Sequence, residues 1–141
     1  MLSRYIKLIS FLLVFFFCST LYAEDILIIH QGYGNTAAKH KNRLENAGHT
    51  VTMQNTSSSY SYTAANYDQV YDIRYSYTSY STADTDRFKT VLSNGGTVYL
   101  VGENGNFDSR NDAIVSFLRD VTGDNNIAHS GNSCCGSGAK Y

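Results

Sequence analysis

The sequence predicts a small α/β domain with a parallel sheet of about four strands and helices on both faces of that sheet. Short apolar runs alternate along the chain with amphipathic helical segments, and glycines separate most of them. The first run, Asp25–His30, is continuously apolar between its ends, which is typical of a strand buried on both faces of a parallel sheet. Because parallel neighbours must be joined by a crossover, the alternation of strands and helices indicates such a sheet.

The first helix is expected directly after a glycine-rich turn. Asn35 or Thr36 can cap its start, the helical pattern runs to about Ala47, and Gly48 is a typical stop. The second helix has a stronger start signal, because Ser81 and Asp84 have the spacing of a capping box. Its apolar face is Phe88, Val91 and Leu92, and it ends at the pair Gly95-Gly96.

The last helix begins at Asp108 or Ser109 and ends before Gly123. Its buried face is predicted from the helical spacing of Ala113, Ile114, Phe117, Leu118 and Val121. Residues 124–141 read as a polar, glycine-rich tail, with a short edge strand near Ile127–His129. The strands are expected at Asp25–His30, Thr50–Gln54, Asp68–Tyr75 and Thr97–Gly102. With right-handed crossovers, this order favours strand order 2-1-3-4, a small flavodoxin-like three-layer sandwich.

The N-terminus predicts export from the cytoplasm. Arg4 and Lys7 precede an apolar stretch, Leu8–Cys18, and a small residue, Ala23, stands before the polar start of the domain. This is the pattern of a secretory signal peptide over residues 1–23, which leaves a domain at 24–123 in a secreted or periplasmic protein. The alternative is an uncleaved membrane anchor, but the apolar stretch is shorter than the about 20 residues that a membrane helix needs.

Composition narrows the classes of partner. From residue 24 onward nine Lys and Arg oppose twelve Asp and Glu, a formal charge of −3 with no basic stripe, so a nucleic-acid partner is not expected. Cys134 and Cys135 are adjacent, and the about 3.8 Å between neighbouring α-carbons is shorter than a disulfide normally spans. They are either thiols in a loose tail, or they form a disulfide with another chain. Neither has the spacing of a metal ligand set, and no cofactor is predicted.

Ligands of such sheets bind beyond the carboxyl ends of the strands, where the strand order reverses. The candidate binding residues are therefore those of three loops that should converge there: Gln31, Gly32, Tyr33, Gly34, Asn35, Thr36, Arg74, Tyr75, Glu103 and Asn104. The first loop, "HQGYGNT", resembles the phosphate loop of flavodoxins, which ends in a similar Gly-Asn-Thr. Gly32 and Tyr33 stand where that family has hydroxyl side chains. The loop is either an FMN- or phosphate-type site or a tight strand-to-helix turn.

A broader resemblance runs from "DILIIH" to "FLRDVTG". The segments "STADTDRFKTVLSNGGTVYLVGENGNF" and "RNDAIVSFL" resemble small secreted members of the class I glutamine amidotransferase-like superfamily. Catalytic members carry a cysteine in a Gly-x-Cys-x-Gly turn, and Asn104 occupies the matching position between Gly102 and Asn106. An amide cannot form the thiolate that acyl transfer requires, and His129 has no acid two residues further on. No catalytic residue is therefore assigned.

Two further sets of side chains allow more than one interpretation. Glu103, Asp108 and Asp112 are potential oxygen ligands for a cation, but the two aspartates are better explained as charges at a helix start. Asp72 and Arg74 share one side of the third strand, where an ion pair is expected. Glu103, at the end of a strand, could act as a general acid or base. Asn55-Thr56-Ser57 matches a glycosylation acceptor.

The tyrosine-rich stretch is the most unusual composition in the chain. Tyr71 and Tyr75 are expected to be half-buried in the third strand. Tyr60, Tyr62, Tyr77 and Tyr80 stand among serines and threonines, so they either form a recognition surface or cover the upper edge of the sheet. Together these observations predict an exported, non-catalytic domain for a protein or glycan ligand. An enzyme or FMN/phosphate-type protein that uses the crevice beside strands one and three is the alternative.

Overall fold

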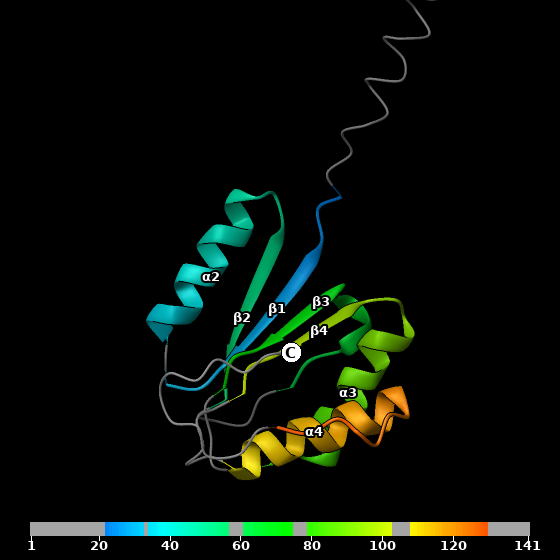
Figure 1. Ribbon diagram of the computed structural model, residues 1–141. Coiled ribbons are helices and arrows are strands. Elements are labelled where there is room, and N and C mark those ends of the chain that lie inside the picture. Colours follow the sequence, from blue (N-terminus) through cyan, green and yellow to red (C-terminus); the bar gives the residue numbers. More distant parts are fainter. Residues whose placement is uncertain (1–21, 33, 57–60, 75–78, 103–107, 130–141) are drawn as a thin grey trace, which may run out of the picture.

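A computed structural model describes residues 22–32, 34–56, 61–74, 79–102 and 108–129, and the statements below concern these residues (Figure 1). Cys134 and Cys135 lie outside the described residues, and so does the predicted signal peptide except for Tyr22 and Ala23. The elements alternate as expected between strands and helices. In chain order they are β1 (Asp25–His30), α2 (Gly34–Asn46), β2 (Thr50–Asn55), the 3-10 turn η1 (Ala64–Asn66), β3 (Gln69–Asp72), α3 (Thr82–Ser93), β4 (Thr97–Leu100) and α4 (Asp108–Thr122).

The four strands form one sheet in the order β2-β1-β3-β4, and every neighbouring pair is parallel. The fold prediction is therefore confirmed: the chain is a small flavodoxin-like α/β sandwich with strand order 2-1-3-4. β1 lies in the centre, where Ile28 is opposite Met53 of β2 and Tyr71 of β3. The central position explains why β1 is apolar along its length, since Ile26, Leu27, Ile28 and Ile29 are all completely buried.

The helices divide between the two faces of the sheet (Figure 1). α2 covers one face over β1 and β2, where Ala37 joins Ile26, Ile28 and Val51 in one hydrophobic cluster. α3 and α4 cover the other face. The cluster on that side is larger and contains, among others, Leu27, Ile29, Val70, Phe88, Val91 and Phe117. Each face of β1 thus contributes to a different half of the core.

The predicted capping box at α3 is confirmed. The Ser81 hydroxyl accepts a hydrogen bond from the Asp84 backbone N–H at 3.1 Å, and the Asp84 carboxylate accepts one from the Ser81 N–H at 3.1 Å. The helix ends at the predicted glycine pair. Gly96 is required there because a β-carbon at this position would lie 2.5 Å from the Asp68 carbonyl oxygen, closer than β-carbons approach other atoms in proteins.

Several element boundaries differ from those predicted, among them the end of β2, which lies at Asn55 rather than Gln54. β3 ends at Asp72 rather than Tyr75, because the Asp72 carboxylate accepts the Arg74 backbone N–H at 3.1 Å and turns the chain out of the sheet. β4 likewise ends at Leu100, short of Gly102. α2 begins at Gly34, so Asn35 and Thr36 lie in its first turn and the prediction that one of them is the cap was wrong.

The buried face of α4 also differs from the predicted one. Phe117 is buried, but Val121 is 36% exposed, and the other buried positions are Val115 and Arg110. The last turn of the helix therefore carries less of the core than its apolar pattern indicates. Beyond the helix, no strand forms at residues 127–129. Instead the chain turns back along α4, where the Arg119 side chain donates a hydrogen bond to the Ile127 carbonyl at 2.8 Å.

Candidate functional site

The candidate site is the carboxyl edge of the sheet, where the topology places the reversal of strand order. β1 has β2 on one side and β3 on the other, and the connections that leave these strands go to opposite faces. The chain from β1 enters α2, whereas the chain from β3 leads to α3. In open parallel sheets this divergence opens a crevice in which ligands bind.

The buried polar side chains of the described residues gather at this same edge. They are His30 at the end of β1, Asp72 at the end of β3, Arg74 just beyond it, Asp84 in the first turn of α3 and Arg110 in the first turn of α4. Elsewhere the described core is apolar. Burial of charge is costly unless each charge is paired, so the pairing at this edge is the next question.

Asp72 and Arg74 form the predicted ion pair, but it is buried rather than exposed. Asp72 has no exposed surface, and Arg74 is 9% exposed. The Arg74 guanidinium binds the carboxylate with two nitrogens: Nε lies 2.9 Å from Oδ1 and Nη2 lies 2.5 Å from Oδ2. Two parallel hydrogen bonds between charged groups fix both side chains, in a geometry that lysine could not reproduce.

Two residues from the neighbouring helices complete what we call the buried charge cluster, which consists of Asp72, Arg74, Asp84 and Arg110. Asp84 Oδ2 lies 3.6 Å from Arg74 Nη1, and Arg110 Nη2 lies 3.1 Å from Asp72 Oδ1. Two carboxylates and two guanidiniums balance, so the cluster is formally neutral. It joins the end of β3 to the first turns of α3 and α4.

Arg110 is the member of the buried charge cluster that the sequence analysis missed. It is 2% exposed, and its Nε has no hydrogen-bond partner among the described residues. A signal was present in the sequence: a cation in the first turn opposes the helix dipole, and Arg110 precedes Ile114 and Phe117 at the spacing of the apolar face. An arginine in that position is explained by a buried acid opposite it, which is Asp72.

Tyr80 packs against both guanidiniums. The Arg110 guanidinium carbon lies 4.1 Å from the centre of the Tyr80 ring, and that of Arg74 lies 5.7 Å away. Burial raises the pKa of the Tyr80 hydroxyl above its ordinary value of 10.0, and the nearby Asp72 carboxylate adds to the increase. The hydroxyl is buried and has no hydrogen-bond partner among the residues described.

This environment predicts a loss of stability in alkali. Above pH 10 the unfolded chain releases the Tyr80 proton while the folded chain retains it, so the free energy of unfolding falls as the pH rises further. Tyr80→Phe should remove this contribution and should cost little at pH 7, because the hydroxyl makes no described hydrogen bond. Denaturant unfolding of both proteins between pH 7 and 11 measures the difference. An identical alkaline decline in the two would contradict the assignment.

The first predicted loop lies on the α2 side of the sheet. Gln31 is partly buried, Gly32 is exposed with a φ of 76°, and α2 follows from Gly34. The first turn of α2 contains no acidic residue. His30 is 6% exposed, and its Nδ1 has no hydrogen-bond partner in the described part of the chain. The loop therefore combines a helix start, a glycine turn and one buried imidazole.

The predicted binding residues fall into separate groups. Gln31, Gly32 and residues 34–36 belong to the α2 side, whereas Arg74 faces α3 and α4. Tyr33, Tyr75, Glu103 and Asn104 lie outside the described residues. Of the predicted cation ligands, Asp108 is an exposed residue in the first turn of α4, and Asp112 Oδ1 lies 2.8 Å from His129 Nε2. Among the described residues no group of three His, Cys, Asp or Glu side chains could hold a metal ion.

Two of the predicted loop tyrosines are structural. Tyr62 is 9% exposed, and Tyr80 is partly buried; both pack against the larger hydrophobic cluster. The Tyr80 ring meets Phe88 edge-on, with centroids 5.3 Å apart. For these two residues the interpretation as a recognition surface was wrong, because their rings cover the core. Tyr60, Tyr75 and Tyr77 lie outside the described residues.

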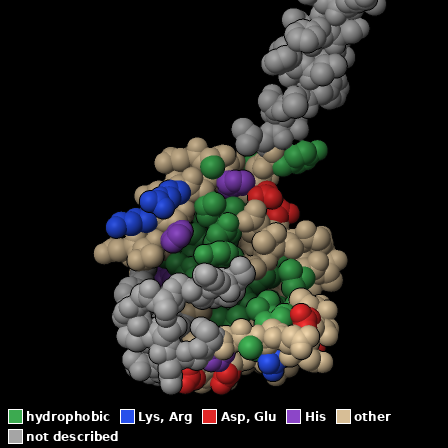
Figure 2. All heavy atoms as spheres, viewed as in Figure 1, with side chains coloured by type: hydrophobic (Ala, Val, Ile, Leu, Met, Phe, Trp, Pro, Cys, Tyr) green, Lys and Arg blue, Asp and Glu red, His purple; other side chains and the backbone are tan. Residues whose placement is uncertain are grey.

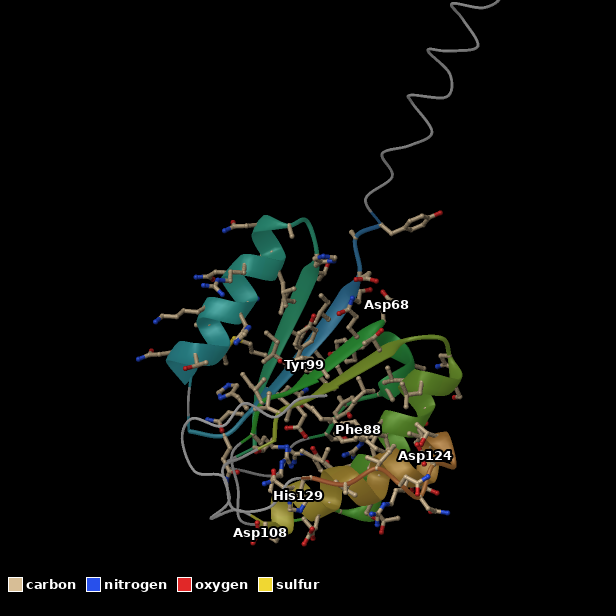
Figure 3. The ribbon with its side chains drawn as sticks, in the orientation of Figure 1. Asp68, Phe88, Tyr99, Asp108, Asp124 and His129 are labelled. Atoms are coloured by element: carbon tan, nitrogen blue, oxygen red, sulfur yellow. The ribbon has the colours of Figure 1, made fainter. Side chains whose placement is uncertain are left out.

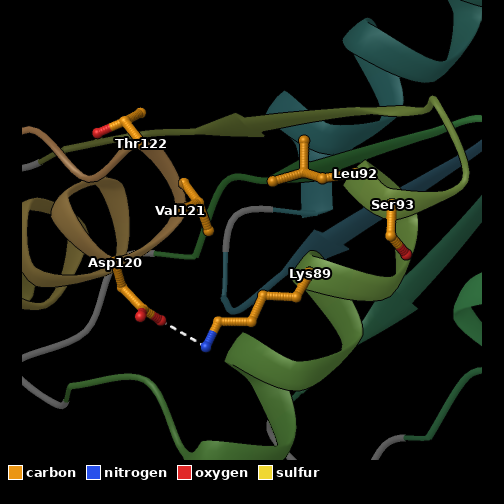
Figure 4. A pocket seen from close by; sticks show the side chains of 6 residues that line it. All are labelled: Lys89, Leu92, Ser93, Asp120, Val121 and Thr122. Carbon is orange, nitrogen blue, oxygen red and sulfur yellow. Dashed lines mark ion pairs between the residues drawn. The ribbon is translucent and has the colours of Figure 1, made fainter.

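A shallow pocket lies at the opposite, amino-terminal edge of the sheet (Figure 4). The last turns of α3 and α4 line it, and the Lys89 ammonium pairs with the Asp120 carboxylate across its opening. That hydrogen bond raises the pKa of the Lys89 ammonium. Both side chains are largely exposed, and none of the buried polar side chains lines this pocket, so it is a weaker candidate than the carboxyl edge.

Across the described ranges, no helix combines the length and apolar character that would let it span a bilayer. Comparisons of the chain with protein-family models, with curated proteins and with solved structures return no match.

Proposed function

We propose that this chain is an exported, non-catalytic domain that binds a ligand or partner at the carboxyl edge of its sheet. The observation that carries the proposal is the concentration of buried polar side chains at that edge: His30, Asp72, Arg74, Asp84 and Arg110. Removal of a charge from water costs several kcal/mol even after relaxation of the protein. Ion pairs that only stabilise a fold could lie anywhere in it, whereas these lie at the edge where parallel sheets bind ligands.

The buried charge cluster also supports binding through the loops that it frames. Residues 75–78 lie between Arg74 and the start of α3, and residues 103–107 lie between β4 and the start of α4. The first stretch is thus flanked on both sides by elements that the cluster joins, and the second stretch is flanked by one of them, α4. Binding residues are commonly carried on loops that a rigid scaffold positions, and a bidentate, buried ion pair is such a support.

The absence of catalysis rests on the resemblance to the amidotransferase-like superfamily. Asn104 stands at the position of the nucleophilic cysteine, and an amide cannot perform that role. The predicted signal peptide supports a location outside the cytoplasm. In that compartment a domain of this size, without its superfamily's nucleophile, fits recognition of a glycan or protein better than amide chemistry.

The second candidate function is an FMN- or phosphate-type binding protein that uses the loop between β1 and α2. Two observations favour it: the first turn of α2 has no acid to offset its positive end, and Nδ1 of the buried His30 lacks a described partner. In this proposal Asn35 and Thr36 would face the anion, since both are exposed in the first turn.

A thermal-shift survey of the purified, exported protein tests both functions. Its probes are a panel of glycans, FMN and inorganic phosphate. Because a ligand of the folded state stabilises it, we expect a saturable rise in melting temperature with at least one glycan and little effect of phosphate. Gln31→Ala should weaken the glycan effect, whereas Lys89→Ala, in the pocket of Figure 4, should leave it unchanged.

The outcomes separate the two candidates. A saturable rise with phosphate or FMN that Asn35→Ala with Thr36→Ala abolishes would replace the leading proposal by the second. A ligand effect lost in Lys89→Ala but kept in Gln31→Ala would place binding at the amino edge and contradict both.

A further inference from the structure

One half of a sheet face is not covered by any described helix. α2 packs over β1 and β2, whereas α3 and α4 lie on the opposite side of the sheet (Figure 1). The period-two alternation of strand side chains places Gln69 and Tyr71 of β3, and Thr97 and Tyr99 of β4, on the α2 side. We call these four residues the bare half-face. All four are uncharged.

An aromatic pair forms the centre of the bare half-face. Tyr71 and Tyr99 are register partners on β3 and β4, and their rings lie 5.3 Å apart with a tilt of 33°. Tyr99 is 53% exposed, one of few large apolar side chains so exposed in the described chain. It projects from the face that carries α2 (Figure 3), where hydrophobic side chains gather beside the helix (Figure 2). Parallel sheets are found almost only with both faces covered, so this exposure needs an explanation.

The arrangement of this side of the molecule allows two copies to pack face to face. α2 stands as a ridge over one half of the face, and the bare half-face lies beside it. A two-fold axis that runs along the boundary between ridge and bare half would place the α2 ridge of each copy over the bare half-face of the other. Such an interface is isologous and closes at two copies.

The charges around the bare half-face agree with this arrangement. Lys39 and Arg43 are exposed on α2, and α2 has no acid in its first turn. Glu24 and Asp68 lie at the other side, at the amino ends of β1 and β3. Figure 2 shows the basic side chains on the helix and acidic ones across the hydrophobic patch. The two-fold rotation brings Lys39 and Arg43 of one copy toward Glu24 and Asp68 of the other. Exposed tyrosine rings also interact favourably with nearby cations.

We propose that two copies of this chain associate through the α2 ridge and the bare half-face, with the two Tyr99 rings near the axis. Each sheet then has both faces covered. The buried charge cluster at the carboxyl edge takes no part in this contact, so the proposal does not depend on the function proposed for that edge.

Sedimentation equilibrium of the purified, exported protein over about 1 μM to 1 mM tests the association at low ionic strength. We expect a reversible dimer, and Tyr99→Asp should raise its dissociation constant by about tenfold or more, because it buries an unpaired charge. The matched control is Val121→Asp, which replaces an exposed apolar residue on α4, on the opposite side of the sheet, and should leave the dissociation constant unchanged.

A charge exchange provides a sharper test. Arg43→Glu should weaken the dimer, and addition of Asp68→Lys should restore part of the affinity, since the rotation pairs these two regions. Thermal unfolding of each variant shows that it remains folded. A protein that is monomeric at about 1 mM, or a dimer that Val121→Asp disrupts and Tyr99→Asp does not, would overturn the proposal.

Discussion

Asp72→Asn is expected to lower the free energy of unfolding by about 3–5 kcal/mol, because it leaves buried guanidiniums without their main counter-charge. Asp72 is fully buried and contacts both Arg74 and Arg110. Asparagine preserves the shape of the side chain, so the effect measures the charge rather than a cavity. Arg74 would keep the more distant Asp84 carboxylate, 3.6 Å from its Nη1, as a negatively charged neighbour. Denaturant unfolding at pH 7 gives the change directly.

The matched control is Asp120→Asn, which removes the acid of the exposed Lys89–Asp120 pair. Exposed pairs contribute little, so this variant should unfold almost like the original protein. A double-mutant cycle then assigns the effect of Asp72→Asn to a partner. Arg110→Met should cost less in the Asp72→Asn background than alone, because the buried charge that it removes has already lost its counter-charge. Equal stability of Asp72→Asn and Asp120→Asn would show that the cluster does not hold the edge together.

The fold could be predicted because its signals are local. A continuous apolar run identifies β1, the Ser81 and Asp84 spacing gives the start of α3, and paired glycines mark the end of that helix. Each of these signals is read within a few residues, and right-handed crossovers then leave few strand orders. The predicted strand ends were less accurate, because side-chain contacts determine where a strand ends. The Asp72 carboxylate accepts the Arg74 N–H, and β3 ends three residues before the predicted boundary.

The candidate site was only partly predictable, because its contacts join distant elements. The Asp72–Arg74 pair follows from the period of a single strand. The contact between Asp72 and Arg110 requires β3 and the start of α4 to meet, which no local pattern states. In the same way, His129 has no acid two residues further on, but the chain that turns back along α4 brings it to Asp112. Burial of Tyr62 and Tyr80 also comes from packing, since their neighbours in sequence are polar.

Phe88→Ala is the second large effect, with an expected loss of about 3–5 kcal/mol in the free energy of unfolding. Phe88 is completely buried between two rings, with its centroid 5.3 Å from that of Tyr80 and 5.6 Å from that of Phe117. It therefore connects the larger hydrophobic cluster to Tyr80, whose ring packs against the guanidiniums of the buried charge cluster. Alanine would leave a cavity that the edge-on neighbours cannot fill without moving, and such cavities carry a cost beyond the lost transfer energy.

Leu92→Ala is the control on the same helix, because Leu92 lies about one turn further along α3 and is 37% exposed. It should cost much less than Phe88→Ala, and Phe88→Leu should fall between the two, since it retains most of the buried volume. If Leu92→Ala destabilised the protein as much as Phe88→Ala, α3 would be rotated about its axis relative to the arrangement described. Tyr80 would then not stack on the Arg110 guanidinium, and the alkaline effect expected from Tyr80 should be absent as well. The two measurements therefore test the packing around the Tyr80 ring independently of each other.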